Sequence, residues 1–311
     1  MNQFAGLSAF PITPASSSGE VDLPAIRRLV SRLAAAGVDS IGLLGSTGSY
    51  AYLSREERRR TLEAAIDEVG GQVPVIVGVG ALRTDEAVRL AQDAKAIGAA
   101  AGLLSAMSYL PLSQDEVFKH VTTIAEQSCL PLCIYDNPGT THFRFSTDLI
   151  ARLSRHPGIV AVKYPTSLPE EVAPHLAAQR AVLPDGFSIG YSGDWCCTEA
   201  MTAGADTWYS VLAGTLPVPC LQIVRAAQRG DMDEARRIDA ALKPVWDLFR
   251  NYTSFRVVHE IARQLDLTTF DPPLPVQPVC EEAKASIAAV LRDCHQTICP
   301  DQVLSPHVPN D

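Results

Sequence analysis

The residue of this sequence best suited to covalent chemistry is Lys163. The chain has only five lysines, and the other four lie in polar stretches with helical patterns: Lys95, Lys119, Lys243 and Lys284. Lys163 instead ends an apolar run, residues 159–162, that has the composition of a buried strand. Removal from water disfavours an ammonium group, so a neutral amine becomes available to attack a ketone and form a Schiff base. The pattern also fits a lysine that extends to solvent or pairs with Asp194.

Two further groups of side chains have the chemistry to assist such a lysine. Residues 45–48, Gly-Ser-Thr-Gly, bring the hydroxyls of Ser46 and Thr47 and several N–H groups into one turn, which favours carboxylate binding. Tyr135 ends another apolar run, and its phenol can carry protons to and from a carbinolamine. Taken alone, the turn also fits a plain strand-to-helix connection, and Tyr135 also fits packing in the core.

The elements that must position these residues alternate regularly along the first 230 residues. Apolar runs typical of strands buried on both faces occur at 6–12, 40–44, 73–79, 100–105, 130–135, 159–163, 187–191 and 207–211. Each run is followed by a segment with helical periodicity, at 22–36, 54–69, 84–97, 113–128, 146–154, 168–179, 194–203 and 218–228. Eight strand–helix pairs predict an α/β fold, the (β/α)8 or TIM barrel.

The pattern changes after residue 230, where only helices are expected, at 231–249, 254–264 and 280–295. We therefore divide the chain into a catalytic barrel, residues 1–230, and a C-terminal helical extension, residues 231–311. Apolar residues such as Trp246 and Phe249 predict that the extension packs on the barrel or on a neighbouring subunit. Residues 299–311 are expected to be loosely ordered.

A barrel of this kind carries its active site at the C-terminal ends of its strands. Lys163, Tyr135 and the turn at 45–48 all lie at such ends, so we expect them to share one pocket. We expect the end of the fourth strand to contribute Ser108 and Tyr109 to the same rim. The strand ends carry no His, Asp and Glu cluster suited to a metal, so a covalent Schiff base without metal or cofactor is predicted.

Composition excludes several other classes of protein. The formal net charge is −9, and the largest basic cluster is three arginines at 58–60, which argues against a nucleic-acid surface. No apolar run of about 18 residues is present, so no membrane span is expected. The first ten residues lack the pattern of a signal peptide, and the eight cysteines form no CxxC pair. We therefore expect reduced thiols and a cytoplasmic location.

The combination of the Gly-Ser-Thr-Gly turn, Tyr-x-x-Pro at 135–138 and Lys163 resembles the dihydrodipicolinate synthase / N-acetylneuraminate lyase family of class I aldolases. Phe-Pro-Ile-Thr-Pro at 10–14, Gly-Ala-Asp at 204–206 and the helical tail extend the resemblance to almost the whole chain. It implies a (β/α)8 lyase that forms a Schiff base with pyruvate or a related 2-oxo acid and then reacts with an aldehyde. It also implies a homotetramer, a dimer of dimers.

The same resemblance implies roles for individual residues. Lys163 corresponds to the Schiff-base lysine, Tyr135 to the proton-relay tyrosine and Ser46 to a hydroxyl of that relay. Tyr109 corresponds to a tyrosine that reaches into the neighbouring subunit's site. The substrate-binding residues that we expect are Thr47, Gly48, Thr140, Thr166 and Tyr209, with Thr47 on the carboxylate of the 2-oxo acid.

The sequence departs from the family at positions that select the second substrate. The lysine-pathway synthases have an arginine at the position of Thr140, and Ser49 replaces a glutamate that usually follows the turn. The other unusual residues are His142, Arg144, Thr207 and Tyr209. These departures predict a 2-oxo acid lyase other than the lysine-pathway synthase. Two alternatives remain open: a dehydratase or aldolase for 2-keto-3-deoxy sugar acids, and a relative that binds a 2-oxo acid without turnover.

Overall fold

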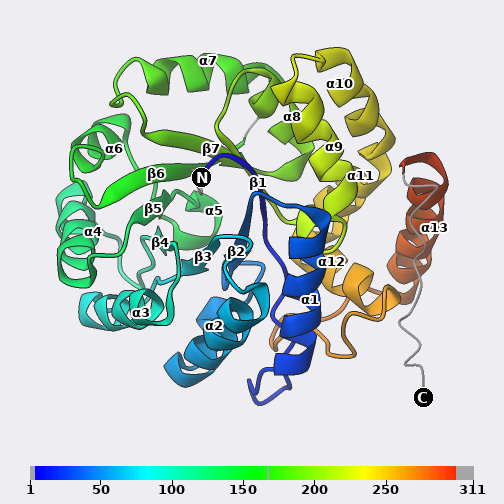
Figure 1. Ribbon diagram of the computed structural model, residues 1–311, viewed down its shortest axis with the longest axis horizontal. Helices are drawn as coiled ribbons and strands as arrows, with labels where there is room; N and C mark the ends of the chain where they lie inside the picture. Colours follow the sequence, from blue (N-terminus) through cyan, green and yellow to red (C-terminus); the bar gives the residue numbers. More distant parts are fainter. Residues whose placement is uncertain (1–3, 167, 299–311) are drawn as a thin grey trace.

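The computed structural model describes residues 4–166 and 168–298. At its centre, eight parallel strands follow one another in chain order, and β8 pairs with β1 to close a barrel (Figure 1). The strands are β1 (Gly6–Ala9), β2 (Ser40–Leu43), β3 (Val75–Gly78), β4 (Ala101–Ser105), β5 (Leu132–Tyr135), β6 (Ile159–Pro165), β7 (Ser188–Ser192) and β8 (Thr207–Ser210). The predicted (β/α)8 barrel is therefore confirmed.

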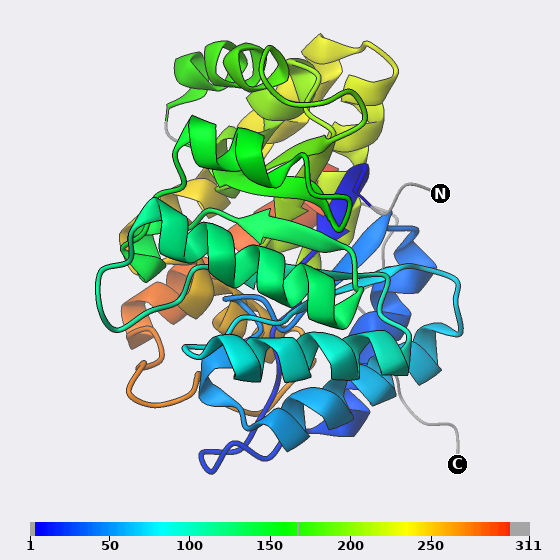
Figure 2. The same ribbon diagram turned by 90° about the vertical axis from the view of Figure 1, so that its left-hand side faces the viewer.

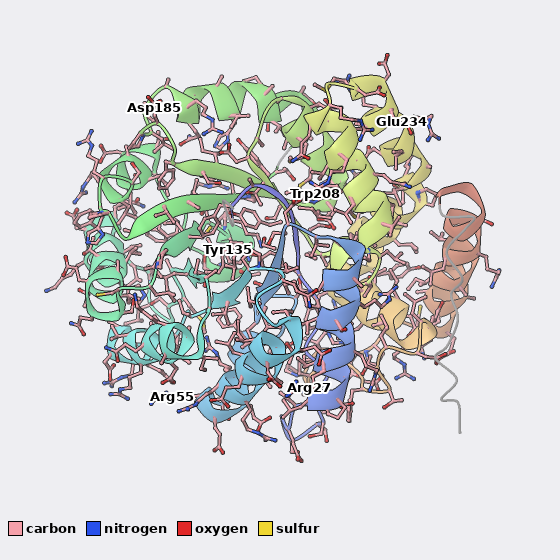
Figure 3. All side chains as sticks on the ribbon, viewed as in Figure 1. Arg27, Arg55, Tyr135, Asp185, Trp208 and Glu234 are labelled. Carbon is pink, nitrogen blue, oxygen red and sulfur yellow. The ribbon has the colours of Figure 1, made fainter. Side chains whose placement is uncertain are left out.

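Helices surround the barrel, and Figure 2 faces the side on which α3, α4 and α6 lie next to one another. The main helices of the ring are α1 (Leu23–Ala36), α2 (Arg55–Val69), α3 (Thr84–Ile97), α4 (Gln114–Ser128), α6 (Thr147–Leu153), α7 (Pro169–Arg180), α8 (Asp194–Thr202) and α9 (Pro217–Gln228). Three short helices follow strands at the rim: η1 (Tyr50–Tyr52), α5 (Pro138–Thr141) and η2 (Leu212–Gly214). Charged residues such as Arg27, Arg55, Asp185 and Glu234 lie on the outside, whereas Tyr135 lies near the barrel centre (Figure 3).

The C-terminal segment contains one more helix break than the sequence predicted. The expected helix at 231–249 is two helices, α10 (Met232–Ala241) and α11 (Lys243–Tyr252), because Pro244 occupies the first turn of α11 and has no N–H to continue α10. They are followed by α12 (Ser254–Gln264) and α13 (Glu281–Ile298). α13 contacts α11 and α12 at the edge of the molecule (Figure 1).

The predicted division between a barrel and a C-terminal extension at residue 230 stays a prediction. α10, the first helix after this boundary, packs directly on α8 and α9 of the barrel. The predicted loose order of residues 299–311 lies outside the described residues. Among the helices that the structure describes, none has both the length and the apolar character needed to span a bilayer.

The extension contains a buried histidine that has no hydrogen-bond partner in the part of the chain that the structure describes. His259 in α12 is 2% exposed, and neither of its ring nitrogens contacts a hydrogen-bonding group among the described residues. Burial lowers the pKa of its imidazole to about 4. The folded protein therefore resists protonation in a pH range in which an unfolded histidine, with a pKa near ~6.5, accepts a proton.

We expect His259 to make the protein less stable in acid. Stability is retained above pH ~6.5 and is lost as pH falls towards 4, because only the unfolded chain takes up the proton. Between pH 7.5 and pH 5, this difference in protonation lowers the free energy of unfolding by about 2 kcal/mol. Thermal and denaturant melts should therefore show a smaller pH dependence for His259→Leu than for the wild type. The same change at exposed His142 is the control, and equal pH dependence of wild type and His259→Leu would contradict the assignment.

Candidate active site

Lys163 lies inside the barrel, on β6, between Tyr135 of β5 and Gly190 of β7 in the strand register. Its side chain is buried, and its Nζ is 3.9 Å from the ring centroid of Tyr135 and 4.4 Å from that of Phe10. In the described part of the chain, no ion pair involves Lys163. The amine is therefore enclosed by aromatic rings and forms no salt bridge with a carboxylate of the described residues.

Asp194, the alternative ion-pair partner for Lys163, forms hydrogen bonds to residues at the end of β8 instead. Its buried carboxylate accepts hydrogen bonds from Trp208 Nε1 at 3.0 Å and from the backbone N–H of Leu212 at 2.7 Å. Ser210 Oγ and the N–H of Val211 donate as well, at 3.1 and 3.2 Å. Burial raises the pKa of Asp194, and these donors oppose that effect by stabilising the charge. Asp194 thus fixes the end of β8 and the start of η2.

The rings of Phe10 and Tyr209 pack beside Lys163, and the position of Phe10 depends on two glycines, one in β2 and one in the turn after it. A Cβ on Gly42 would lie 2.2 Å from the Phe10 ring, and one on Gly45 would lie 2.8 Å from it. Any side chain at either position would displace Phe10. The ring of Tyr209 packs edge-on against Phe10, and its centroid lies 5.8 Å from Lys163 Nζ. These glycines therefore contribute by leaving room for a ring.

The turn after β2 combines a hydroxyl relay with free N–H donors. Ser46 Oγ lies 3.5 Å from Tyr135 Oη, at the long end of hydrogen-bond distance. In the part of the chain that the structure describes, the N–H groups of Thr47 and Gly48 donate to no other residue. A Cβ on Gly48 would lie 2.9 Å from the backbone of Leu44, so the close turn requires glycine there. Two adjacent N–H groups and the Thr47 hydroxyl form a suitable site for a carboxylate.

The other predicted site residues have separate surroundings. Tyr209 is fully buried, with its Oη 3.5 Å from Cys133 Sγ. Thr140, in α5, accepts a hydrogen bond from Asn137 Nδ2 at 2.6 Å, and Thr166 donates to the carbonyl oxygen of Gly193 at 3.1 Å. Both threonines therefore form hydrogen bonds to residues of the loops at the barrel rim. Their contact with a substrate stays a prediction.

Tyr109 is 92% exposed, and no contact of its side chain with Lys163 or Tyr135 is present within this chain. The fourth strand ends at Ser105, as the apolar run at 100–105 predicted, so Ser108 and Tyr109 lie in the loop that follows and not at the strand end itself. The residue that β4 places beside Tyr135 is Ser105. The predicted role of Tyr109 in a neighbouring subunit's site stays a prediction.

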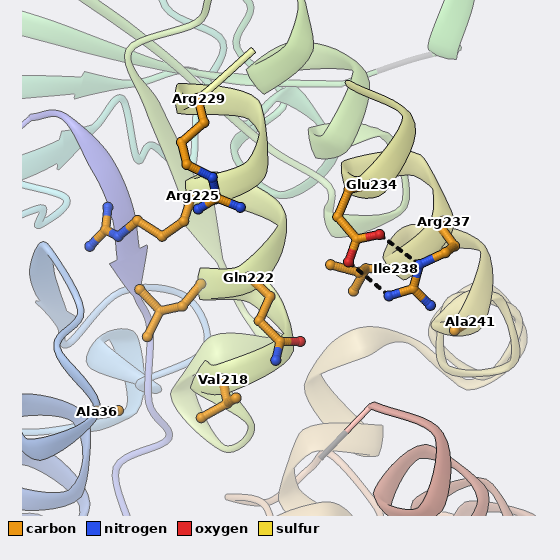
Figure 4. A pocket seen from close by; sticks show the side chains of 10 residues that line it. Ala36, Val218, Gln222, Arg225, Arg229, Glu234, Arg237, Ile238 and Ala241 are labelled. Atoms are coloured by element: carbon orange, nitrogen blue, oxygen red, sulfur yellow. Dashed lines mark hydrogen bonds and ion pairs between the residues drawn. The ribbon is translucent and has the colours of Figure 1, made fainter. Parts of the chain in front are cut away.

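A cavity of about 570 Å³ lies on the outer side of β5–β7 and is lined by Asp136, Arg144, Thr166 and His175, among others. Burial raises the pKa of Asp136 to about 6. Arg144 thus faces this cavity, whose lining does not include Lys163. A second cavity, of about 420 Å³, lies between α9 and α10, where Glu234 and Arg237 form an ion pair (Figure 4). None of the predicted site residues lines that second cavity.

Sequence reasoning missed Phe10, whose ring lies 4.4 Å from Lys163 Nζ, and the hydrogen-bonded pair of Tyr50 and Ser105, of which Ser105 pairs with Tyr135 in the strand register. Phe10 was noted only as part of the Phe-Pro-Ile-Thr-Pro segment. Tyr50 directly follows the turn at 45–49, and its phenol is hydrogen-bonded to Ser105 at 2.9 Å. Only their places in the sequence could have pointed to the site, because Ser105 ends an apolar run and Tyr50 follows a glycine turn.

A buried lysine, a neighbouring phenol and an anion-binding turn at the C-terminal rim of a (β/α)8 barrel define a candidate Schiff-base lyase. Comparison with known proteins agrees with this class. The model of the dihydrodipicolinate synthetase family matches residues 3–294. A 4-hydroxy-tetrahydrodipicolinate synthase of Pelobacter propionicus is 31% identical over 289 residues, covering 93% of this chain and 98% of the relative.

Solved structures agree as well. A dihydrodipicolinate synthase from Agrobacterium tumefaciens is 51% identical with a TM-score of 0.92, covering 94% of this chain and 98% of the other. A pyruvate complex of the dihydrodipicolinate synthase from Acinetobacter baumannii has a TM-score of 0.86 at 27% identity, covering 93% and 98%. The chain belongs to the dihydrodipicolinate synthetase family, which confirms the resemblance. Membership supports a pyruvate-dependent lyase that works through a lysine Schiff base.

Proposed function

We propose that the protein forms a Schiff base between Lys163 and pyruvate or a related 2-oxo acid, and then makes or breaks a carbon–carbon bond. The observation that carries the proposal is the enclosure of Lys163 by Tyr135 and Phe10, with Ser46 Oγ 3.5 Å from the Tyr135 phenol. A buried amine beside a proton donor is the arrangement that imine formation requires.

The reaction begins when the neutral Nζ of Lys163 adds to the ketone carbon. Tyr135 delivers a proton to the resulting carbinolamine hydroxyl, water leaves, and a cationic imine forms. The imine withdraws electrons from the adjacent carbon, which loses a proton to the phenolate left on Tyr135 and gives an enamine. The enamine attacks the carbonyl carbon of an aldehyde, and in the reverse direction the same bond breaks. Water then releases the product and restores the amine.

The carboxylate of the 2-oxo acid is proposed to bind at the turn after β2. The free N–H groups of Thr47 and Gly48 support this, together with the Thr47 hydroxyl. Hydrogen bonds to a charged acceptor contribute about 1.5–3 kcal/mol each. This binding would hold the ketone carbon next to Lys163 and would exclude ketones that lack the acid group.

We further propose a cytoplasmic homotetramer in which Tyr109 completes the site of a neighbouring subunit. Tyr109 is 92% exposed and Leu110 is 68% exposed, which supports an apolar contact with another chain at this rim. Cys129, Cys133, Cys196, Cys197, Cys220 and Cys280 are free thiols, as expected in a reducing compartment.

For the second substrate, we propose a hydroxylated or uncharged aldehyde in place of aspartate semialdehyde. The rim loops offer Thr140 and Thr166, which have one hydroxyl each and no charge, and Thr166 lines the outer cavity at the end of β6. Arg144 lines the outer cavity, beside His175 and Asp136. The hydroxyls also support the alternative of a 2-keto-3-deoxy sugar acid as substrate, to be cleaved or dehydrated through the same lysine.

We expect poor condensation of pyruvate with aspartate semialdehyde. Without the charge-assisted pairing of an arginine, binding of the aldehyde's carboxylate should be ten- to a hundred-fold weaker, or about 1.5–3 kcal/mol. The measurement compares kcat/KM for aspartate semialdehyde with a panel of neutral aldehydes and deoxy-keto acids. Thr140→Arg should increase the efficiency with aspartate semialdehyde, whereas Thr140→Val, the matched control, should not.

A wild-type efficiency of about 10⁴ M⁻¹s⁻¹ or above with aspartate semialdehyde would contradict this specificity and favour the lysine-pathway reaction. Imine trapping without turnover of any member of the panel would favour the non-catalytic 2-oxo acid-binding relative. Turnover of a deoxy-keto acid with release of water, and without release of pyruvate, would identify the dehydratase.

A further inference from the structure

A second phenol lies close to the proposed site and belongs to the same chain. Tyr50, the first residue of η1, has its Oη 2.9 Å from Ser105 Oγ and 3.6 Å from Met107 Sδ. The two residues of this hydroxyl pair come from the β2–α2 connection and from the end of β4. They are 55 positions apart in the sequence, so only the closed barrel brings them together.

The strand register links this pair to the Schiff-base residues. Ser105 of β4 pairs with Tyr135 of β5, and Tyr135 pairs with Lys163 of β6. Three neighbouring strands therefore place a serine hydroxyl, a phenol and an amine at the same height of the barrel. Gly80 keeps space open beside the pair, because a Cβ there would lie 3.1 Å from Ser105 Oγ and 3.5 Å from the Tyr50 ring.

The ring of Tyr50 is held in place by a buried arginine. Arg58 is 7% exposed, and its guanidinium donates to the carbonyl oxygens of Gly78 at 2.8 Å and Gly80 at 3.2 Å. The guanidinium carbon lies 5.3 Å from the centroid of the Tyr50 ring. Desolvation lowers the pKa of Arg58 to about 10, so it stays cationic at neutral pH. A fixed cation over an aromatic ring holds that ring in one orientation.

The pKa of the Tyr50 phenol depends on the charge of Tyr135. Burial raises the pKa of Tyr50, while the Ser105 hydrogen bond and Arg58 lower it and a negative charge on Tyr135 would raise it. At neutral pH the phenol therefore keeps its proton and can donate to Ser105 Oγ. That bond leaves the Ser105 proton to act as a donor in turn.

We propose that Tyr50 is a positioning residue for proton transfer, acting through Ser105 on Tyr135 and on the enamine formed at Lys163. Ser46, in the turn after β2, and the Tyr50–Ser105 pair, which reaches Tyr135 through β4, then both act on Tyr135 from within one chain. The inference deepens the proposed function and rests on it. Only protons move: one passes along the hydroxyls to the substrate carbon, and solvent replaces it.

The test uses pyruvate alone and needs no second substrate. In D₂O, enamine formation exchanges the methyl protons of pyruvate for deuterium, which NMR measures as a rate. Tyr50→Phe and Ser105→Ala should each slow exchange about ten-fold, or 1.4 kcal/mol. The double variant should be no slower than either single one, because the two groups act as one unit. Tyr52→Phe, on the same short helix but 47% exposed, is the matched control and should exchange at the wild-type rate.

Borohydride trapping of the imine is measured on the same samples. We expect wild-type amounts of trapped pyruvate in Tyr50→Phe, because a distorted pocket would lose trapping as well as exchange. Normal trapping with unchanged exchange in Tyr50→Phe overturns the inference alone, as does equal slowing in Tyr52→Phe. Absence of trapped pyruvate on Lys163 of the wild type overturns the proposed function, and the inference with it.

Discussion

Incubation with pyruvate and borohydride is expected to attach one reduced pyruvyl group per chain, on Lys163. Borohydride reduces the imine to a stable amine, so the label marks the nucleophile. Lys163 is buried against the rings of Tyr135 and Phe10, and no ion pair involves it among the described residues. Mass spectrometry of peptides locates the label. A label on another lysine, or no label, would contradict the assignment.

Replacement of the lysine sharpens this expectation. Lys163→Arg keeps a positive group but should accept no label, because guanidinium stays protonated and is not a nucleophile. Turnover should fall on the order of 10⁴–10⁶-fold, as for loss of a covalent nucleophile. Lys119→Arg is the control, since Lys119 lies exposed on α4, and its labelling should match the wild type. Circular dichroism and thermal melts would show whether both variants are folded.

The barrel and the central pair of the site follow from the sequence for a simple physical reason. Strands buried on both faces require nearly continuous apolar runs, so Lys163 stands out as a polar end to such a run. Because the C-terminal ends of parallel strands meet at one rim, Lys163, Tyr135 and the turn at 45–48 were expected together. The structure brings Lys163, Tyr135 and Ser46 close to one another.

Contacts between distant segments could not be derived in this way. The Tyr50–Ser105 bond depends on the register of β2 and β4 and on the path of the loop after β2, which no local pattern specifies. The position of Phe10 depends on the missing side chains of Gly42 and Gly45. The orientation of Arg144 is likewise a property of the rim loop, and the structure directs this residue to the outer cavity.

The loss of the Tyr135 hydroxyl is expected to slow turnover by roughly 10²–10⁴-fold, the usual contribution of a general acid–base group. Tyr135→Phe keeps the ring, whose centroid is 3.9 Å from Lys163 Nζ, so the surroundings of the amine remain. What disappears is the proton donor for the carbinolamine and the acceptor near Ser46 Oγ at 3.5 Å. Imine trapping should therefore persist in this variant, but at a lower rate.

A matched control separates the hydroxyl from the ring and from general damage to the barrel. Tyr164 is the next residue after Lys163 on β6, and its Oη donates to Gln179 on α7 at 2.8 Å. Since it lines the outer cavity and not the lysine site, Tyr164→Phe should keep turnover near the wild-type level even if its melting temperature falls. A wild-type rate in Tyr135→Phe would show that the phenol moves no proton. Equal losses in both variants would attribute the effect to packing, because Tyr164, unlike Tyr135, does not line the site of the reacting amine.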